Sequence, residues 1–161
     1  MKIFMATPTR DLERAHPEYV RARDSLLKNG LALPKDYQLA YRYVEGLSIL
    51  SQARALITSL CLASGADYIF MVDDDIFFRP EDLRAAVLSG LPIVGLPCLL
   101  HEEPRADGED RVHTLNYSVF SGDPQVEDKD WRQVRAVGAG ALLVKAEVFH
   151  AMKRIRPHFI S

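Results

Sequence analysis

An apolar run that ends in three consecutive carboxylates constrains the fold of this chain more than any other feature. Residues 68–72 are all apolar and β-favouring, Asp73, Asp74 and Asp75 follow directly, and the apolar character resumes at 76–78. A continuous apolar run predicts a strand that is buried on both faces, as in the middle of a parallel sheet. Three like charges at the end of such a strand repel one another and favour a bound cation.

The alternation of side chains along a strand predicts the side to which each carboxylate points. If the strand continues through the acids, Asp73 and Asp75 point to one side and Asp74 points to the other. Two carboxylates on one side, at the carboxyl end of a central strand, predict a divalent-cation site. Asp73 and Asp75 are therefore the first candidate metal ligands.

The order of apolar patterns predicts an α/β fold in a single domain of 161 residues. Strand-like and helix-like segments alternate over the first hundred residues, which indicates a mostly parallel sheet with right-handed crossovers and flanking helices. The later pattern favours a small antiparallel part, after a charged loop at 101–111. Strands are expected at 2–6, 37–44, 68–72, 91–96, 113–120, 131–137 and 141–144, and helices at 17–28, 46–64, 80–89 and 147–154.

Composition excludes several classes of protein. Hydrophobic residues make up 48% of the chain and charged residues 26%, as in ordinary globular proteins. A net charge of -2 gives no electrostatic reason to expect nucleic acid as a partner. No segment approaches the roughly 20 apolar residues of a membrane span. Cys61 and Cys98 lie in apolar surroundings, which favours reduced thiols in a cytoplasmic protein, although their pairing is not excluded.

An arginine lies on the expected core side of the helix before the acidic strand. Arg54 falls within the apolar face of that helix, between Leu50 and Ile57. A buried charge without a partner is energetically costly. Arg54 therefore needs an anionic partner, either a carboxylate such as Asp67 or Asp11 or the phosphate of a nucleotide. The apolar face is predicted from helical spacing and consists of Leu50, Ala53, Ile57, Leu60, Cys61 and Ser64.

Several catalytic and nucleotide-binding motifs are absent from the sequence. It contains no P-loop, no Gly-x-Gly-x-x-Gly fingerprint and no Gly-x-Ser-x-Gly elbow. His and Cys residues show no zinc spacing. Phe77 occupies the place where dehalogenase-like phosphatases carry a small hydroxyl residue or Val, which argues against that class of enzyme.

Four segments, taken in order, resemble GT-A-type glycosyltransferases, particularly family 2-like enzymes. They are a first strand followed by Thr7-Pro8-Thr9, the helical segment 52–55 (Gln-Ala-Arg-Ala), the acidic run 67–76 followed by Pro80-Glu81-Asp82, and the glycine-containing segment 137–144 with Val148-Phe149. The third segment is similar to the Asp-x-Asp motif of that family. The resemblance covers the chain to about residue 155.

The resemblance implies a GT-A fold and a nucleotide-diphospho-sugar donor. Residues 1–100 would form the nucleotide-binding half and 101–161 the acceptor-side half. A divalent cation, Mn²⁺ or Mg²⁺, would be held by Asp73 and Asp75. The acceptor, which could be a glycan, a lipid or a protein, is not indicated. The residues expected to contact the nucleotide sugar are Thr7, Pro8, Thr9, Arg10, Arg54, Asp73, Asp74, Gly138 and Gly140.

The sequence departs from the family pattern at two points. Ala55 stands where the family has Asn after the arginine, and the chain ends at Ser161, before the expected catalytic base and late metal-binding His. Candidates for the base are Glu102, Glu103 and Asp107, and the candidate for the metal ligand is His158. Two other functions therefore stay open: a module that binds nucleotide sugar without transfer, and a metal-dependent phosphohydrolase.

Overall fold

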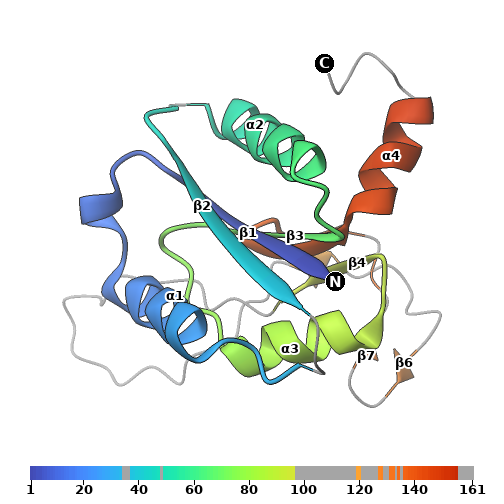
Figure 1. Cartoon of the computed structure of the whole chain (residues 1–161), viewed down its shortest axis with the longest axis horizontal. Helices are drawn as coiled ribbons and strands as arrows, with labels where there is room; N and C mark the ends of the chain where they lie inside the picture. Colours follow the sequence, from blue (N-terminus) through green and yellow to red (C-terminus); the bar gives the residue numbers. More distant parts are fainter. Residues whose placement is uncertain are drawn as a thin grey trace.

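The structure is a computed structural model that describes residues 1–33, 37–47, 49–96, 119–120, 127–128, 131–132, 134 and 136–155. A five-stranded sheet in the order β2-β1-β3-β9-β4 forms its centre, with helices on both faces (Figure 1). The predicted α/β class and mostly parallel sheet are confirmed. The strands of this sheet are β1 (Lys2–Thr9), β2 (Gln38–Glu45), β3 (Tyr68–Val72), β4 (Ile93–Gly95) and β9 (Ala141–Lys145).

Four of the five strands run in the same direction. β1 pairs in parallel with both β2 and β3, whereas β9 is antiparallel to both of its neighbours, β3 and β4. The last of the described strands, β9, thus lies between β3 and β4, which follow one another in this sheet along the sequence. Two short antiparallel pairs complete the expected antiparallel part: β5 (Val119–Phe120) with β8 (Ala136–Val137), and β6 (Glu127–Asp128) with β7 (Trp131–Arg132).

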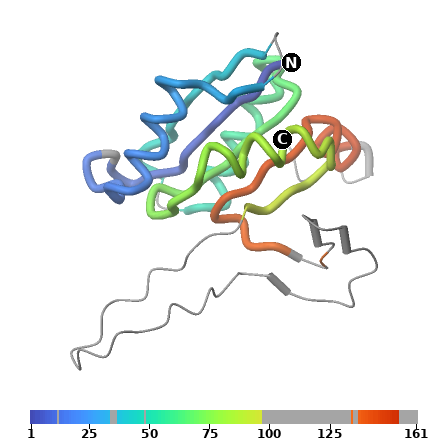
Figure 2. The backbone as a smooth tube through the Cα atoms, turned by 90° about the horizontal axis from the view of Figure 1, so that it is seen from below, coloured from blue at the N-terminus to red at the C-terminus, as the bar shows by residue number. Residues whose placement is uncertain are grey.

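The helices cover the two faces of the sheet in pairs. Both views place α1 and α3 side by side on one face, and Figure 1 shows α2 and α4 on the other (Figures 1 and 2). The helices are α1 (Pro17–Asn29), α2 (Leu50–Ala63), α3 (Pro80–Ser89) and α4 (Ala146–Ile155), with a short 3₁₀ helix η1 (Leu12–Arg14) before α1. Gly30 and Gly90, both with φ of 66°, end α1 and α3, as the sequence predicts.

Alternating side chains of the central strands supply two separate cores. In β3, Phe70 and Val72 pack towards α1 and α3, whereas Ile69 and Met71 pack towards α2. All five residues of β3 are buried, so the predicted two-faced burial is confirmed. Cys61 lies buried in the α2 core, where burial raises the pKa of its thiol to about 12. Cys98 lies outside the described residues.

Some predicted boundaries and faces are wrong. On α2, Leu50 and Leu60 are expected to be buried, but each is more than 40% exposed, because the face that meets the sheet is centred on other residues. The residues that are buried against the sheet are Ala53, Ile57, Thr58 and Cys61 in α2, and Leu83, Ala86 and Val87 in α3.

Two expected strands also differ. β4 is shorter than the predicted 91–96, and its Ile93 is half exposed. The predicted strand 131–137 consists of two short strands, β7 and β8, which pair with different partners. The charged segment expected at 101–111 lies outside the described residues.

Within the described ranges, no helix is both long enough and apolar enough to cross a membrane.

A buried chain of hydroxyl groups joins α1 to the end of β1. Tyr19 and Thr7 are fully buried, and their hydroxyl oxygens lie 2.5 Å apart. The Tyr19 hydroxyl also lies 3.1 Å from that of Tyr41 in β2. Burial raises the pKa of Tyr19, so this hydroxyl stays protonated and holds its hydrogen bonds across the physiological range.

Replacing Tyr19 with Phe is expected to lower the free energy of unfolding by about 1–3 kcal/mol, because it leaves the buried Thr7 hydroxyl without its partner. Tyr43→Phe, the same chemical change at a residue that is 48% exposed, is the matched control and should change stability little. Urea denaturation measures both. Equal effects of the two substitutions would show that the hydroxyl chain contributes nothing specific.

Candidate functional site

The three carboxylates form a turn directly after β3. β3 ends at Val72, and the Ile76 amide donates to the Asp73 carbonyl at 3.2 Å. We refer to Asp73–Asp75 as the acid turn. β3 ends before these residues, but the predicted alternation holds for the first two acids: Asp73 lies towards α2, where Arg54 binds it, and Asp74 lies towards the start of α1.

Asp73 is held from two sides. Arg54 Nη2 donates to both carboxylate oxygens of Asp73, at 3.0 and 2.9 Å, and to the carbonyl of Ala139 at 3.2 Å. The Asp73 amide donates to the Gly140 carbonyl at 2.8 Å, which extends the pairing of β3 with β9 by one residue. The acid turn is thereby connected to α2 and to the segment before β9.

Burial raises the pKa of Asp73, and the charges of Asp75 and Asp74 act in the same direction. The Arg54 guanidinium opposes this rise and favours the ionised carboxylate. About a quarter of each side chain of the pair is exposed, so the ion pair is partly screened by water. Arg54 therefore counteracts part of the effect that burial has on the pKa of Asp73.

The anionic partner expected for Arg54 is a residue of the acid turn. The alternatives Asp67 and Asp11 are wrong: the Asp67 carboxylate accepts from the Lys2 amide at 2.7 Å, and Asp11 pairs with Arg14 at 3.4 Å. Within the described part of the chain, Arg54 Nε is the buried side-chain nitrogen that lacks a hydrogen-bond partner. The guanidinium thus has donor capacity beyond what the described residues use.

Asp74 faces the opposite side of the site. Its carboxylate accepts a hydrogen bond from the Thr9 hydroxyl, and its carbonyl accepts from the His16 amide at 2.8 Å. Asp74 is half-buried. Its contacts are made to the end of β1 and the start of α1.

Asp75 is the exposed member of the acid turn. Its carboxylate is the most accessible of the three to a ligand. The described ranges contain no group of three or more His, Cys, Asp or Glu side chains that could hold a metal ion by themselves. A cation at the acid turn would therefore take its remaining ligands from phosphate and water, as Mg²⁺ and Mn²⁺ commonly do.

The predicted opening loop Thr7-Pro8-Thr9 is the last part of β1. β1 pairs with β3 only as far as Ala6, so near Pro8 the strand has a partner on one side, where a missing amide proton is tolerated. Thr7, Pro8 and Thr9 are all buried, and the Thr7 hydroxyl is engaged by Tyr19. Of this group of candidates, Arg10 alone has an exposed side chain.

The other predicted site residues divide into two sets. Gly138 and Gly140 lie in the segment between β8 and β9, next to the acid turn through the bond from Asp73 to Gly140. Glu102, Glu103, Asp107 and His158 lie outside the described residues. The sequence does not predict the contacts of His16 with Asp74 and of Ala139 with Arg54. Both residues use backbone groups, which every residue has, so their identity gives no signal.

Gly95 controls how closely β8 approaches the sheet. A Cβ built on Gly95 would lie 2.0 Å from Cγ2 of Val137, far inside van der Waals contact. Val137 directly precedes the segment 138–140, whose carbonyls hold Arg54 and Asp73. The absence of a side chain at Gly95 thus permits the packing that places this segment.

Gly95→Ala is expected to destabilise the protein by about 1–3 kcal/mol, because the branched Val137 has to move. Removing the two methyl groups that clash, in the double variant Gly95→Ala/Val137→Ala, should recover part of the loss. Thermal unfolding of both single variants and the double variant tests this. Strictly additive losses would contradict the close contact.

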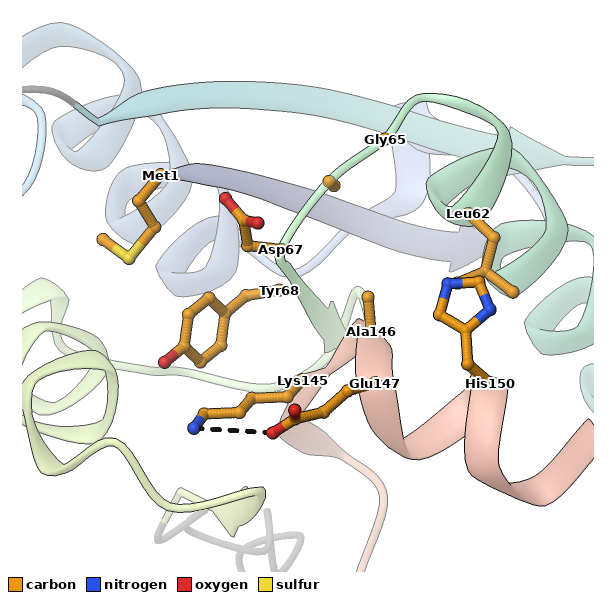
Figure 3. Close-up of a pocket in the computed structure, with 10 residues that line it drawn as sticks. Met1, Leu62, Gly65, Asp67, Tyr68, Lys145, Ala146, Glu147 and His150 are labelled. Carbon is orange, nitrogen blue, oxygen red and sulfur yellow. Dashed lines mark ion pairs between the residues drawn. The ribbon is translucent and has the colours of Figure 1, made fainter.

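An open hollow of about 640 Å³ lies at the other end of β3 (Figure 3). Figure 3 shows Asp67 and Tyr68 on one side, the Lys145–Glu147 ion pair (3.6 Å) at the start of α4, and His150 further along this helix. β3 separates this hollow from the acid turn by about 17 Å of strand. The hollow is thus distinct from the predicted site.

Comparisons with known proteins support the fold. No family model and no curated protein matches the chain. Among solved structures, A197 from STIV aligns with a TM-score of 0.59 at 19% identity, over 96% of this chain and 70% of that one. A glycosyltransferase involved in the glycosylation of the major capsid of PBCV-1 aligns with a TM-score of 0.42 at 10% identity, over 99% of this chain and 67% of the other. The first likeness shows a shared fold, and the second is too distant to carry an argument.

Proposed function

We propose that this chain is a glycosyltransferase that uses a nucleotide-diphospho-sugar donor and a divalent cation. The observation that carries the proposal is the acid turn, in which Arg54 fixes Asp73 while Asp75 is exposed. The turn follows a central strand at the carboxyl edge of a mainly parallel sheet, where ligands of open α/β sheets bind.

Transfer of a sugar from such a donor leaves a nucleoside diphosphate with growing negative charge. A divalent cation, when bound, supplies positive charge opposite this leaving group. Asp75, with its exposed carboxylate, and Asp73 would hold the cation. Hard carboxylate oxygens suit Mn²⁺ and Mg²⁺.

Arg54 and the segment 138–140 would prepare the site for the donor. Arg54 orients Asp73 through both carboxylate oxygens and favours its ionised form. The Ala139 and Gly140 carbonyls fix Arg54 and the Asp73 amide in turn. Groups that are already in place when the donor binds need no reorganisation during the reaction. Candidates for the base that activates the acceptor remain Glu102, Glu103 and Asp107.

A mass-spectrometric assay tests the proposal. The protein is incubated with a panel of nucleotide sugars and Mn²⁺, with candidate acceptors, and the products are compared with those of Asp75→Asn. We expect Mn²⁺-dependent release of nucleoside diphosphate and free or transferred sugar. Release of inorganic phosphate would instead indicate a phosphohydrolase, and binding without any product would indicate a donor-binding module.

A further inference from the structure

Asp74 fastens both ends of the connection between β1 and α1. β1 ends at Thr9, whose hydroxyl donates to the Asp74 carboxylate. α1 begins at Pro17, and the amide of His16, directly before it, donates to the Asp74 carbonyl at 2.8 Å. A single residue of the acid turn thus binds the residue directly before this connection, Thr9, and the last residue of the connection, His16. We refer to residues 10–16 as the connecting segment.

The connecting segment is itself internally bonded. The Asp11 amide donates to the Thr9 hydroxyl oxygen at 3.2 Å, and the Glu13 amide donates to the Asp11 carboxylate at 3.0 Å. The Arg14 amide donates to the Asp11 carbonyl at 3.1 Å, within η1. These bonds fix the shape of the connecting segment, and its bonds to Asp74 connect it to the acid turn.

The hydrogen bond from Thr9 to Asp74 is suited to attaching the connecting segment to the acid turn. Thr9 is 5% exposed, and a hydrogen bond to a carboxylate is stronger when it is shielded from water. The Thr9 hydroxyl accepts from Asp11 while it donates to Asp74, so it links the connecting segment directly to the acid turn. Arg10, which follows Thr9, is exposed.

We propose that Asp74 is a positioning residue that holds the connecting segment beside the acid turn, so that Arg10 faces the phosphate groups of the bound nucleotide. This inference rests on the proposed function for the identity of the ligand. It assigns the three acids different tasks: Asp73 and Asp75 face the cation, whereas Asp74 contributes no ligand. Arg10 adds a positive charge to the site, where a guanidinium can contact two phosphate oxygens.

Inorganic pyrophosphate with Mn²⁺ is the probe for binding, since it carries the diphosphate without a base or sugar. Asp74→Ala and Thr9→Val are expected to weaken pyrophosphate affinity about 10-fold and to leave Mn²⁺ affinity within about 2-fold. Asp74→Asn and Thr9→Ser preserve the acceptor oxygen and the donor hydroxyl respectively, so they should restore affinity. Arg10→Gln should weaken pyrophosphate binding to the same extent as Asp74→Ala.

Hydrogen exchange at the amides of the connecting segment measures the attachment without any ligand. Asp74→Ala should accelerate exchange at Asp11 and across the segment, whereas Asp74→Asn should not. The His16 amide should respond least, because it donates to the main-chain carbonyl of residue 74, which both variants keep. Unchanged exchange in Asp74→Ala would overturn the positioning role. Loss of Mn²⁺ affinity in both Asp74 variants would also overturn it, because Asp74 would then be a ligand.

The two proposals can fail separately. If the unaltered protein binds no pyrophosphate in the presence of Mn²⁺, the phosphate-facing role of Arg10 is wrong and so is the nucleotide site. Faster exchange in Asp74→Ala would still establish the attachment of the segment. If pyrophosphate binds and Arg10→Gln binds it equally well, the proposed function survives and the inference about Arg10 does not.

Discussion

Asp75→Asn is expected to lower the Mn²⁺-dependent affinity for a nucleoside diphosphate by at least about 100-fold, since loss of an outer-shell partner alone commonly costs 10–100-fold. The substitution removes the charge of the exposed carboxylate that is most accessible to a cation, and it preserves the shape of the side chain. Because Asp75 is exposed, the free energy of unfolding should change by no more than about 0.5 kcal/mol. Titration calorimetry with and without Mn²⁺ measures the affinity.

Glu81→Gln is the matched control for Asp75→Asn. Glu81 is an exposed acid in the first turn of α3, a few residues further along the chain, so its substitution removes the same charge from the same part of the molecule. It should leave nucleotide affinity within about 2-fold, because exposed charges at a distance are screened. Equal affinities of Asp75→Asn and the unaltered protein would rule out Asp75 as a ligand.

Arg54→Met is expected to destabilise the protein by about 1–3 kcal/mol near neutral pH, because it leaves the half-buried Asp73 carboxylate without its charged partner. The range is below that of a fully buried pair, since about a quarter of each side chain is exposed. The three hydrogen bonds of Arg54 Nη2 connect α2, the acid turn and the segment before β9, so the substitution also loosens the site.

The destabilisation by Arg54→Met should shrink on acidification. Burial already raises the pKa of Asp73, and loss of the guanidinium raises it further. A carboxyl group whose pKa is raised in the folded state stabilises the protein below its unfolded pKa, and this contribution is lost as pH rises through the folded pKa. Urea denaturation should therefore give a larger stability loss at about pH 7 than at about pH 4, near the ordinary range of an aspartate.

Two further variants make the Arg54 result interpretable. Arg54→Lys retains a positive charge near Asp73 and should recover part of the stability. Arg21→Met removes an exposed arginine of α1 and should change stability little at either pH. A loss for Arg54→Met that does not depend on pH would show that packing of the side chain, rather than its charge, is the important interaction.

The fold could be predicted well from apolar periodicity. The burial of β3 on both faces follows from its uninterrupted apolar residues, and the ends of α1 and α3 follow from Gly30 and Gly90. The insertion of β9 between β3 and β4 could not be predicted, because pairing between residues distant in sequence has no local signal. The exposed Leu50 and Leu60 show that helical spacing predicts the period of a buried face better than the position of its centre.

The sequence identifies several residues of the candidate site, namely Arg54 and the acid turn, but it does not predict which of them bind one another. The cost of a buried charge correctly predicts an anionic partner for Arg54, but it does not identify Asp73, and the carboxylates named in advance, Asp67 and Asp11, are wrong. Strand alternation correctly places Asp73 and Asp74 on opposite sides, although β3 itself ends at Val72. The contact of Thr9 with Asp74 follows from the register of β1 with β3, which pairs Ala6 with Met71, and that register has no local signal in the sequence.

The central claim is that the acid turn binds a nucleoside diphosphate together with a divalent cation. A thermal-shift screen of nucleoside diphosphates and their sugars, with Mn²⁺ or with EDTA, tests it most directly. At a ligand concentration of about 100 times Kd, binding stabilises the folded state by about 2.7 kcal/mol, which corresponds to roughly 5–10 °C in Tm for a domain of this size. We predict such a rise for at least one nucleoside diphosphate with Mn²⁺ and none with EDTA. A Tm that no nucleotide raises, or that rises equally with EDTA, would contradict the account.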